Sequence, residues 1–400
     1  MRRRQFLVGI GSLATGWSMA GSARRRPLRV GVVGAGILGS SIGLHLALAG
    51  ADVTMIESVG PAAGATRNSY AWLNAFVGDP LYRDLRLASL ARWRWLDDRY
   101  ALGIQWGGYL NWGAGEEGRA TVQANFDQIV DSSAPARMQS PDEVVRRAPY
   151  LTPGPIDAAL FAPNDGHLDP EAVTLRLIEA ARACGVRFAC PSRVEELAFR
   201  HGRLTAAITS TGRVELDRLV VAAGTATPAI AALAGGHFSL AHAPGILAHT
   251  HPLAFLTNLT HEGPGESSFK QLANGRIVAY DAPHPPDIAA HTGIRANEMD
   301  YPSEALRREH GERMLAHLSR YCPQIQARDW ARLTLGFRPM PPDDRPIVGA
   351  LPSAPDVHIA VTHSGVTLAA ILGRLVASEV VDGTRSTVLH PYRPERFAAH

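Results

Sequence analysis

The feature that most constrains the fold is the stretch RVGVVGAGILGSSIGLHLALAGADVTMIE, from Arg29 to Glu57. Residues 28–33 are apolar almost throughout, as in a parallel strand that is buried on both faces. A G-x-G-x-x-G turn follows at 34–39, and the apolar positions from Ile37 to Leu48 suit a helix packed on a sheet. Residues 51–56 return as a second strand, so the stretch predicts an α/β fold built on a strand–helix–strand unit.

The three glycines and the acid at the end of this unit predict a dinucleotide site. Gly34 permits the tight turn, Gly36 lets the backbone approach a pyrophosphate, and Gly39 lets the helix pack closely on the strand. The pyrophosphate would face the positive end of the helix dipole. Glu57 ends the second strand, where a carboxylate accepts hydrogen bonds from an adenosine ribose and repels a 2′-phosphate. His45, inside the helix, is interpreted as a packed or surface histidine.

Composition sets broad limits on the protein. Its 400 residues are enough for two globular units, and its hydrophobic fraction of 46% is ordinary for a soluble chain. A net charge of +3 is small for this length, and part of it lies in the first residues, so we expect no nucleic-acid partner.

The first residues, Met1 to Ala23, have the anatomy of a signal peptide: a basic start, a mildly apolar middle and small residues after it. Residues 6–20 are too short and too rich in glycine for a stable membrane span. The run from Arg3 to Leu7 resembles the twin-arginine export motif, with cleavage after Ala20 or Ala23. We therefore expect residues 1–26 to be a leader handled by the twin-arginine machinery and the protein to be periplasmic; the alternative is a cytoplasmic N-terminus with chance arginines.

Cysteine and histidine spacing predicts no metal site. Cys184, Cys190 and Cys322 lack the spacing of metal ligands, and either they are small buried residues or two of them pair. His249 and His251 share a face of a predicted strand, but two histidines without a third ligand are more often ordinary residues.

Two helices are expected outside the first unit. Residues 79–100 place five apolar side chains in an approximate helical stripe that suits core packing: Leu81, Leu85, Leu90, Trp93 and Leu96. A second helix begins at the pair Asp169-Pro170 and leads into a strand.

Several distant segments together resemble the D-amino-acid oxidase family of FAD-dependent enzymes, which includes glycine oxidase, sarcosine oxidase and D-amino-acid dehydrogenases. The resemblance covers most of the chain after the leader, although residues 80–161 and 237–330 match only in general rhythm. Its motifs are the dinucleotide fingerprint, G-A-T-x-N-S at 64–69, DGHLDP at 165–170, V-V-A-A-G at 220–224, G-F-R-P at 336–339 and T-H-S-G-V-T at 362–367.

The resemblance implies a Rossmann-type FAD-binding domain and a discontinuous α+β substrate domain that contains an antiparallel sheet. The FAD-binding domain is expected to comprise residues 27–78, 163–234 and 331–400, and the substrate domain residues 79–162 and 235–330. In the family, a set of positions along these segments lines the cofactor. The matching residues are Gly34, Gly36, Gly39, Glu57, Thr66, Asn68, Ser69, Val194, Ala223, Gly224, Gly336, His363, Ser364, Gly365, Val366 and Thr367.

Amides at the start of the helix after His363 would face the pyrimidine edge of the flavin, where they stabilise the negative charge of the reduced ring. Sarcosine oxidases attach flavin to a cysteine close to the position of Gly336, so the glycine implies FAD that is not covalently bound.

Arg338 is the residue that the resemblance assigns to the substrate carboxylate, because a guanidinium offers paired donors that match two carboxylate oxygens. Its alternative is a pair with Asp343 or Asp344 that holds the loop. Tyr280 and Lys270 are candidates for orienting or proton-accepting groups over the flavin, or are simply strand residues.

The implied reaction is oxidation of the C–N bond of an amino acid or amine by hydride transfer to flavin N5, giving an imine that water hydrolyses. Oxygen or a quinone would take the electrons. Two alternatives stay open at this point: a flavin-binding subunit without its own turnover, and an NAD-dependent dehydrogenase. The substrate, its stereochemistry and the oligomeric state are not determined by these residues.

Overall fold

The computed structural model describes residues 26–281, 300–301 and 303–397. The expected leader, with its arginine pair and both cleavage positions, lies outside the described residues apart from Arg26. Along the described part of the chain, no helix combines the length and apolar character needed to cross a membrane.

A six-stranded sheet forms the first half of the molecule, in the order β18-β19-β12-β1-β2-β8. All neighbours are parallel except the β18–β19 hairpin. The two strands that flank the glycine turn lie side by side as predicted, and β12 pairs with the other edge of β1. The strands are β1 (Arg29–Val33), β2 (Asp52–Ile56), β8 (Arg187–Ala189), β12 (Arg218–Val221), β18 (Ile347–Leu351) and β19 (Ala354–Val361).

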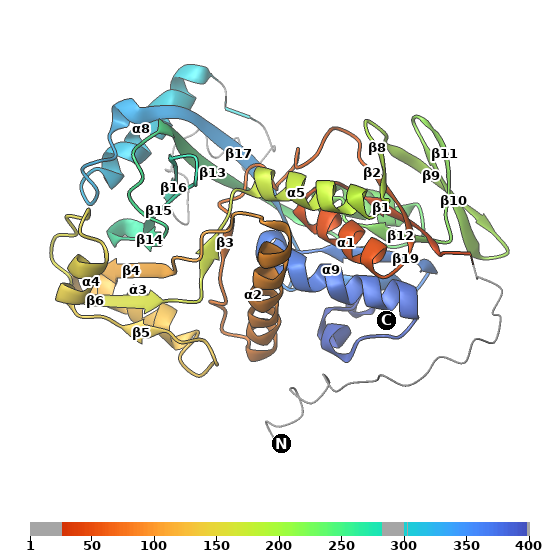
Figure 1. Ribbon diagram of the computed structural model, residues 1–400, viewed down its shortest axis with the longest axis horizontal. Coiled ribbons are helices and arrows are strands. Elements are labelled where there is room, and N and C mark those ends of the chain that lie inside the picture. The colour runs from red at the N-terminus through yellow and green to blue at the C-terminus, as the bar shows by residue number, and fades with distance from the viewer. Residues whose placement is uncertain (1–25, 282–299, 302, 398–400) are drawn as a thin grey trace.

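Three helices lie together against this sheet: α1 (Ile37–Leu48), α5 (Pro170–Ala183) and α9 (Gly365–Asp382) (Figure 1). The α1 and α9 backbones approach closely because Gly373 has no side chain; a Cβ there would lie 2.4 Å from Ser41 Oγ. His45 is buried in this contact, as its packed interpretation required. Its Nδ1 lies 2.7 Å from the Ser41 carbonyl, and its Nε2 accepts from Arg92 at 3.1 Å.

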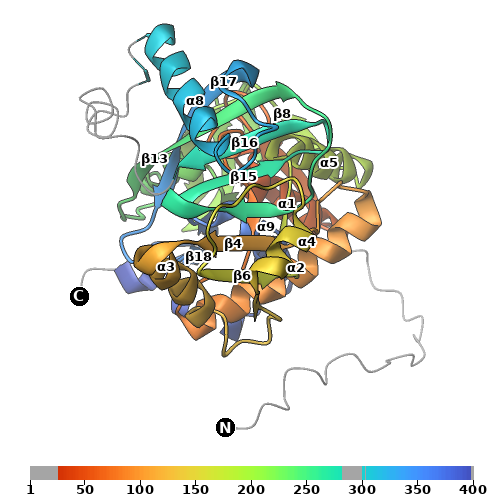
Figure 2. The same ribbon diagram turned by 90° about the vertical axis from the view of Figure 1, so that its left-hand side faces the viewer.

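A mixed eight-stranded sheet forms the second half, in the order β17-β13-β16-β15-β14-β4-β6-β5 (Figure 2). It is antiparallel as expected, except that β14 and β4 run parallel. Its strands are β4 (Tyr109–Gly113), β5 (Arg137–Met138), β6 (Ala158–Ala162), β13 (Ala241–Pro252), β14 (Thr260–Glu262), β15 (Ser267–Gln271), β16 (Arg276–Asp281) and β17 (Trp330–Met340). Its helices are α3 (Gly115–Asp127), α4 (Pro141–Arg147) and α8 (Glu304–Leu318).

Smaller elements complete the described chain. A three-stranded sheet lies beside the six-stranded one (Figure 1), and a two-stranded sheet pairs residues 72–73 with residues 166–167 next to the segment that follows α2. These strands are β9 (Val194–Arg200), β10 (Arg203–Thr209), β11 (Gly212–Glu215), β3 (Trp72–Leu73) and β7 (Gly166–His167). The remaining helix is α6 (Thr227–Ala232), with 3₁₀ turns η1 (Gly224–Ala226), η2 (Pro264–Glu266), η3 (Ala327–Asp329), η4 (Thr387–Tyr392) and η5 (Pro394–Phe397).

Helix α2 (Pro80–Tyr100) begins where the sequence indicated, with the Asp79 side chain accepting from the amides of Leu81 and Tyr82. The expected core stripe is correct at 85, 90, 93 and 96, which are buried. It is wrong for Leu81, whose side chain is 63% exposed, because the buried face of the first turn is formed by Tyr82 and Arg83 and Leu81 points away from it.

Two elements join the predicted domains. α2, on the substrate side of the predicted boundary, packs along α9 and shares its apolar core. β17, on the FAD side of the boundary, pairs with β13 along its whole length. The boundaries themselves stay a prediction.

Cys184, Cys190 and Cys322 are all free thiols, so no two of them pair; Cys322 is buried as expected, but Cys184 is exposed and Cys190 is only partly buried. His249 is buried and His251 is exposed, and the described residues contain no cluster of three potential metal ligands.

Candidate active site

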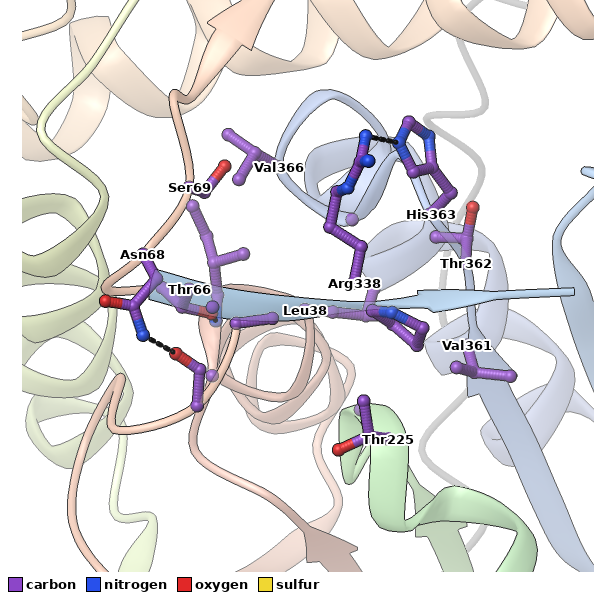
Figure 3. Close-up of a pocket in the computed structure, with 18 of the residues that line it drawn as sticks. Leu38, Thr66, Asn68, Ser69, Thr225, Arg338, Val361, Thr362, His363 and Val366 are labelled. Carbon is purple, nitrogen blue, oxygen red and sulfur yellow. Dashed lines mark hydrogen bonds between the residues drawn. The ribbon is translucent and has the colours of Figure 1, made fainter. Parts of the chain in front are cut away.

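A cavity of about 1090 Å³ gathers residues that are far apart in the sequence. Its walls come from the starts of α1 and α9, the ends of β2, β12 and β19, and the loop after β2. The eight-stranded sheet adds side chains from β13, β14, β16 and β17. Every predicted cofactor residue lines this cavity except Gly39, and Figure 3 shows several of them in place.

The start of α1 is shaped for close approach of a ligand. Gly34 has a φ of 102°, and a Cβ there would lie 2.4 Å from the Ala222 carbonyl oxygen. Gly39 lies behind the turn, and a Cβ on it would meet the Gly34 oxygen at 2.1 Å, which explains its role in packing. Gly36, at the N-cap position, has no side chain to cap the helix, and apart from the Ile37 amide, which donates to Thr66 Oγ1, the amides of the first turn remain available to an anion.

Glu57 lies at the mouth of the same turn. Its Oε2 accepts from the amide of Ala35 at 2.8 Å, and its Oε1 accepts from the amide of Val59 at 2.8 Å. The carboxylate therefore holds the turn and still presents oxygens to the cavity, where a ribose hydroxyl would donate to it. Val194, Ala223 and Gly224 line the cavity near this end.

The loop between β2 and β3 forms the neighbouring wall (Figure 3). Thr66 Oγ1 accepts from the amide of Ile37 at 3.1 Å, and Asn68 Nδ2 donates to the Gly64 carbonyl at 3.3 Å. Ser69 Oγ accepts from the amide of Ala71 at 3.1 Å. These bonds keep the loop folded over the start of α1.

Gly336 on β17 packs against this loop. A Cβ on Gly336 would lie 2.3 Å from Asn68 Cβ, which is closer than two carbon atoms approach. The position therefore has no room for a cysteine side chain unless the loop moves, and this agrees with FAD that is not covalently bound.

The start of α9 faces the cavity from the other side. Ser364 occupies the N-cap position, but its side chain does not cap the helix, which leaves the amides of the first turn available. Thr367 Oγ1 instead donates to the Trp72 carbonyl at 3.0 Å. Two helix starts thus line one cavity, which fits a cofactor with a pyrophosphate at one helix start and a ring that becomes negatively charged on reduction at the other.

Arg86 is a cavity residue that the sequence analysis missed. It is 9% exposed; its Nη2 donates to Ser364 Oγ at 2.5 Å and its Nη1 donates to Asn74 Oδ1 at 2.9 Å. The guanidinium therefore ties α2 to the loop before α9. The available signal was a charged residue within the apolar face of a helix, next to Leu85.

Arg338 projects from β17 into the cavity and meets His363 (Figure 3). Its Nη1 lies 3.2 Å from His363 Nε2, and its Nη2 donates to the Pro244 carbonyl at 3.4 Å. Neither Asp343 nor Asp344 bonds to Arg338: Asp343 instead pairs with Arg396 at 2.7 Å. The loop-holding alternative is therefore not formed.

Burial and charge act together on this pair. Burial among protein atoms lowers the pKa of Arg338. Burial, followed by the positive charges of Arg338 and Arg86, lowers the pKa of His363 to about 4. His363 is therefore neutral at ordinary pH, and its Nε2 accepts from the guanidinium, since arginine only donates.

The two sheet candidates separate in the structure. Tyr280 lines the large cavity, with its ring 4.6 Å from that of Tyr70. Lys270 does not line it, so its placement over the flavin is corrected. It lies opposite Val278 on β16, two residues along the strand from Tyr280, and lines a second cavity of about 250 Å³. Its Nζ donates to the Leu168 carbonyl at 2.7 Å, and burial lowers its pKa to about 7.

Comparison with known proteins agrees with this architecture. Residues 29–379 match the model of a family described as FAD dependent oxidoreductase, which decides between FAD and NAD in favour of FAD. Glycine oxidase from Geobacillus kaustophilus superposes with a TM-score of 0.77 at 19% identity, covering 93% of this chain and all of that one.

Two curated relatives illustrate the sequence similarity. The bifunctional protein ThiO/ThiG of Synechocystis is 25% identical over 62% of this chain and 36% of its own length. The 4-methylaminobutanoate oxidase (formaldehyde-forming) of Paenarthrobacter nicotinovorans is 22% identical over 93% of this chain and 46% of its own length. The chain thus spans less than half the length of these two relatives.

Proposed function

The chain belongs to the family of FAD-dependent oxidoreductases, and from this premise we propose that it oxidises the C–N bond of an amino acid or amine. The carbon–hydrogen bond beside the nitrogen of the uncharged amine breaks, the hydrogen leaves with the electron pair as a hydride, and the iminium ion that remains is hydrolysed by water to a carbonyl compound and ammonia or an amine. FAD, when bound, supplies the hydride acceptor.

The observation that carries the proposal is the position of Arg338. Its side chain reaches the cavity and contacts His363, and His363 lies in the loop just before the start of α9. The family resemblance puts the flavin ring at this helix start, so a carboxylate held by Arg338 would lie next to the reacting ring. A paired guanidinium–carboxylate contact fixes orientation as well as affinity.

The residues present fit FAD. The start of α1 and Glu57 would hold the pyrophosphate and the adenosine ribose, and the start of α9 would face the flavin ring. The loop through Thr66 and Ser69 runs between these two ends. Gly336 leaves no side chain for a covalent link.

The chain's own contribution to chemistry is positioning and exclusion of water. Tyr280 and Tyr70 present an aromatic wall near the cavity end that β16 forms, and such a surface favours an uncharged amine over an ammonium that must be desolvated. Neutral His363 accepts from Arg338 and holds the guanidinium in place for the carboxylate.

The test is a visible spectrum of the purified protein followed by anaerobic addition of D- and L-amino acids, glycine, sarcosine and simple amines. Bleaching of the flavin band by one of them is the expected result. Bound flavin that no amine reduces would support the alternative of a flavin-binding subunit without turnover. A protein that binds no FAD when supplied with it would remove the proposed activity.

We further propose that the protein is exported by the twin-arginine machinery to the periplasm. The support is the basic, apolar and small-residue order of the first residues, with Arg3 and Arg4 together. Replacing both arginines by lysine should move the protein from the periplasmic to the cytoplasmic fraction. An unchanged distribution would contradict this route.

The electron acceptor is proposed to be oxygen or a quinone. The reduced enzyme, mixed with each acceptor in turn, distinguishes the two: rapid reoxidation by oxygen with release of peroxide defines an oxidase, and reoxidation by a soluble quinone alone defines a dehydrogenase.

A further inference from the structure

We propose that the second cavity binds a small dianionic oxyanion, such as phosphate or sulfate, between Lys270, Arg276 and Arg332. The inference goes beyond the proposed amine oxidation, because it concerns a different cavity and a binding equilibrium that needs no turnover. It comes from the register of the eight-stranded sheet, from the charges around the cavity and from the burial of one of them.

One row of the eight-stranded sheet forms a wall of this cavity. Arg332 on β17 is opposite His249 on β13, and His249 is opposite Val278 on β16. Val278 is in turn opposite Lys270 on β15, and Figure 2 shows these four strands side by side. Residues opposite one another in neighbouring strands point to the same face of a sheet. Arg276, two positions before Val278, lies on that face as well, so three cations from three strands reach one cavity.

The opposing wall comes from the first half of the molecule. Arg67 and Ser69 lie in the loop after β2, and Asp169, Pro170 and Glu171 lie at the start of α5. Ser69 also lines the large cavity, so the two cavities share this loop. An anion in the second cavity would therefore contact both halves of the molecule.

Positive charge exceeds negative charge around the cavity. The lysine, arginine and acidic residues of its lining are Arg67, Lys270, Arg276, Arg332, Asp169 and Glu171. They leave an excess of two positive charges when the lysine is protonated. A dianion would neutralise this excess.

The acidic residues are already engaged elsewhere. Glu171 pairs with Arg67 at 3.1 Å, and Asp169 Oδ1 accepts from two amides in the first turn of α5. Among the residues that the structure describes, the side chains of Arg276 and Arg332 form no hydrogen bond and no ion pair. Their guanidinium groups keep the paired donors that match the oxygens of an oxyanion.

Lys270 is the buried member of this group. It is 1% exposed, and its Nζ donates to the Leu168 carbonyl at 2.7 Å. An ammonium group has three N–H donors, so two remain for a ligand. Burial lowers the pKa of Lys270 to about 7, and the charge of Asp169 opposes this only in part. A buried ammonium is costly without a partner of opposite charge, and an anion in the cavity would supply that charge.

His249 reports that the cations converge. Burial, followed by three nearby positive charges, lowers the pKa of His249 to about 3. These charges are, in order of their effect, Arg332, Lys270 and Arg276. Nε2 of His249 contacts Thr334 Oγ1 at 3.0 Å, and the neutral ring adds no charge of its own. The site is therefore built from cations on three strands around one neutral residue.

The experiment uses the FAD-loaded protein, in which the cofactor occupies the anion-binding turn of the large cavity. Isothermal titration calorimetry at constant ionic strength compares phosphate, sulfate and chloride. Phosphate and sulfate should bind and raise Tm, because a ligand of the folded state stabilises it. Chloride, with a single charge and no array of oxygens, should bind about tenfold more weakly or less.

Arg276→Gln and Arg332→Gln each remove one cation from a side chain that is half-buried or exposed, so both should fold. Each should weaken phosphate binding about tenfold or more, as expected when a charge-assisted contact is lost. Lys270→Met removes the buried donor and should abolish the rise in Tm that phosphate causes.

Arg176→Gln is the matched control, because Arg176 lies on α5, has a side chain that is 62% exposed and pairs with Glu179. It should keep the phosphate affinity of the unmodified protein. Arg338→Ala tests the location of the ion, since Arg338 lines the large cavity, and it should also keep that affinity.

Three results would overturn the site: no phosphate binding by the unmodified protein, equal binding by the Arg276, Arg332 and Lys270 variants, or a loss of binding in Arg338→Ala alone. The last result would place the ion in the large cavity. Failure of every amine to reduce the flavin would remove the proposed function but not this site, because the calorimetry requires no turnover.

Discussion

Arg338 and His363 are in hydrogen-bond contact, 3.2 Å from Nη1 to Nε2, although one comes from a strand of the eight-stranded sheet and the other from the loop before α9. The contact joins the two halves of the molecule at the cavity. It also gives the imidazole a defined role, since a neutral His363 accepts a hydrogen bond at its unprotonated Nε2 and so orients the guanidinium.

Arg338→Ala should lower kcat/KM for carboxylate-bearing amines about 10- to 100-fold, the range expected when a charge-assisted hydrogen-bonded contact is lost. The loss should appear mainly in KM, and flavin should remain bound. Steady-state kinetics with a good substrate checks this. Arg338→Lys keeps the charge but not the paired donors, so its kcat/KM should lie between those of the unmodified enzyme and of Arg338→Ala. An Arg338→Ala enzyme with an unaltered KM would remove Arg338 from substrate binding.

Glu57→Arg should lower the flavin content of the purified protein. The change removes the acceptor for the ribose and puts a cation beside the start of α1, and it breaks the bonds that Glu57 accepts from Ala35 and Val59. Glu57→Gln should retain more flavin, because its amide oxygen still accepts. The ratio of flavin to protein absorbance measures both variants. Equal flavin in all three proteins would contradict the placement of the adenosine end.

Gly336→Ala should destabilise the folded protein by about 1–3 kcal/mol, because the new Cβ overlaps Asn68 Cβ. Adding Asn68→Gly removes the atom that it meets, so the double variant should regain part of the loss. Urea unfolding of the four proteins gives the coupling free energy. Additive effects would show that the loop moves aside freely.

Lys270→Met should stabilise the protein, and more at pH 6 than at pH 9. Burial lowers the pKa of Lys270 from 10.5 to about 7, so between these values the unfolded chain binds a proton that the folded chain does not. Stability in the lysine protein therefore rises with pH across this window, and below it the full cost of the buried charge is present. Thermal unfolding at both pH values checks the difference. The same gain at each pH would contradict a buried, titrating amine.

The strand–helix–strand unit at the N-terminal end follows from local sequence alone. Its glycines, its apolar spacing and Glu57 act within a single unit, and the structure keeps them where the pattern placed them, with α1 spanning Ile37–Leu48. The family resemblance extended the prediction to motifs far along the chain. Arg338 and the turn before α9 reach one cavity as it implied.

Other outcomes needed the tertiary structure. Alternation along a strand indicates which residues share a face of the sheet, but it does not determine which of them lies over a given cavity. The sequence therefore did not separate Lys270 on β15 from Tyr280 on β16, although Tyr280 lines the large cavity and Lys270 lines the second one. Leu81 fitted the approximate helical stripe but points away from the buried face, which Tyr82 and Arg83 form in the first turn.

Arg86 was missed for a related reason. The role of a charged residue on an apolar helix face is not defined until its partners are known, and the partners of Arg86 are Ser364, before α9, and Asn74, in the loop before α2. The sequence by itself determined the dinucleotide turn and the residue types that bind charge. Only the tertiary structure decided which of those charges face one cavity, because that depends on strand register and helix packing between segments hundreds of residues apart.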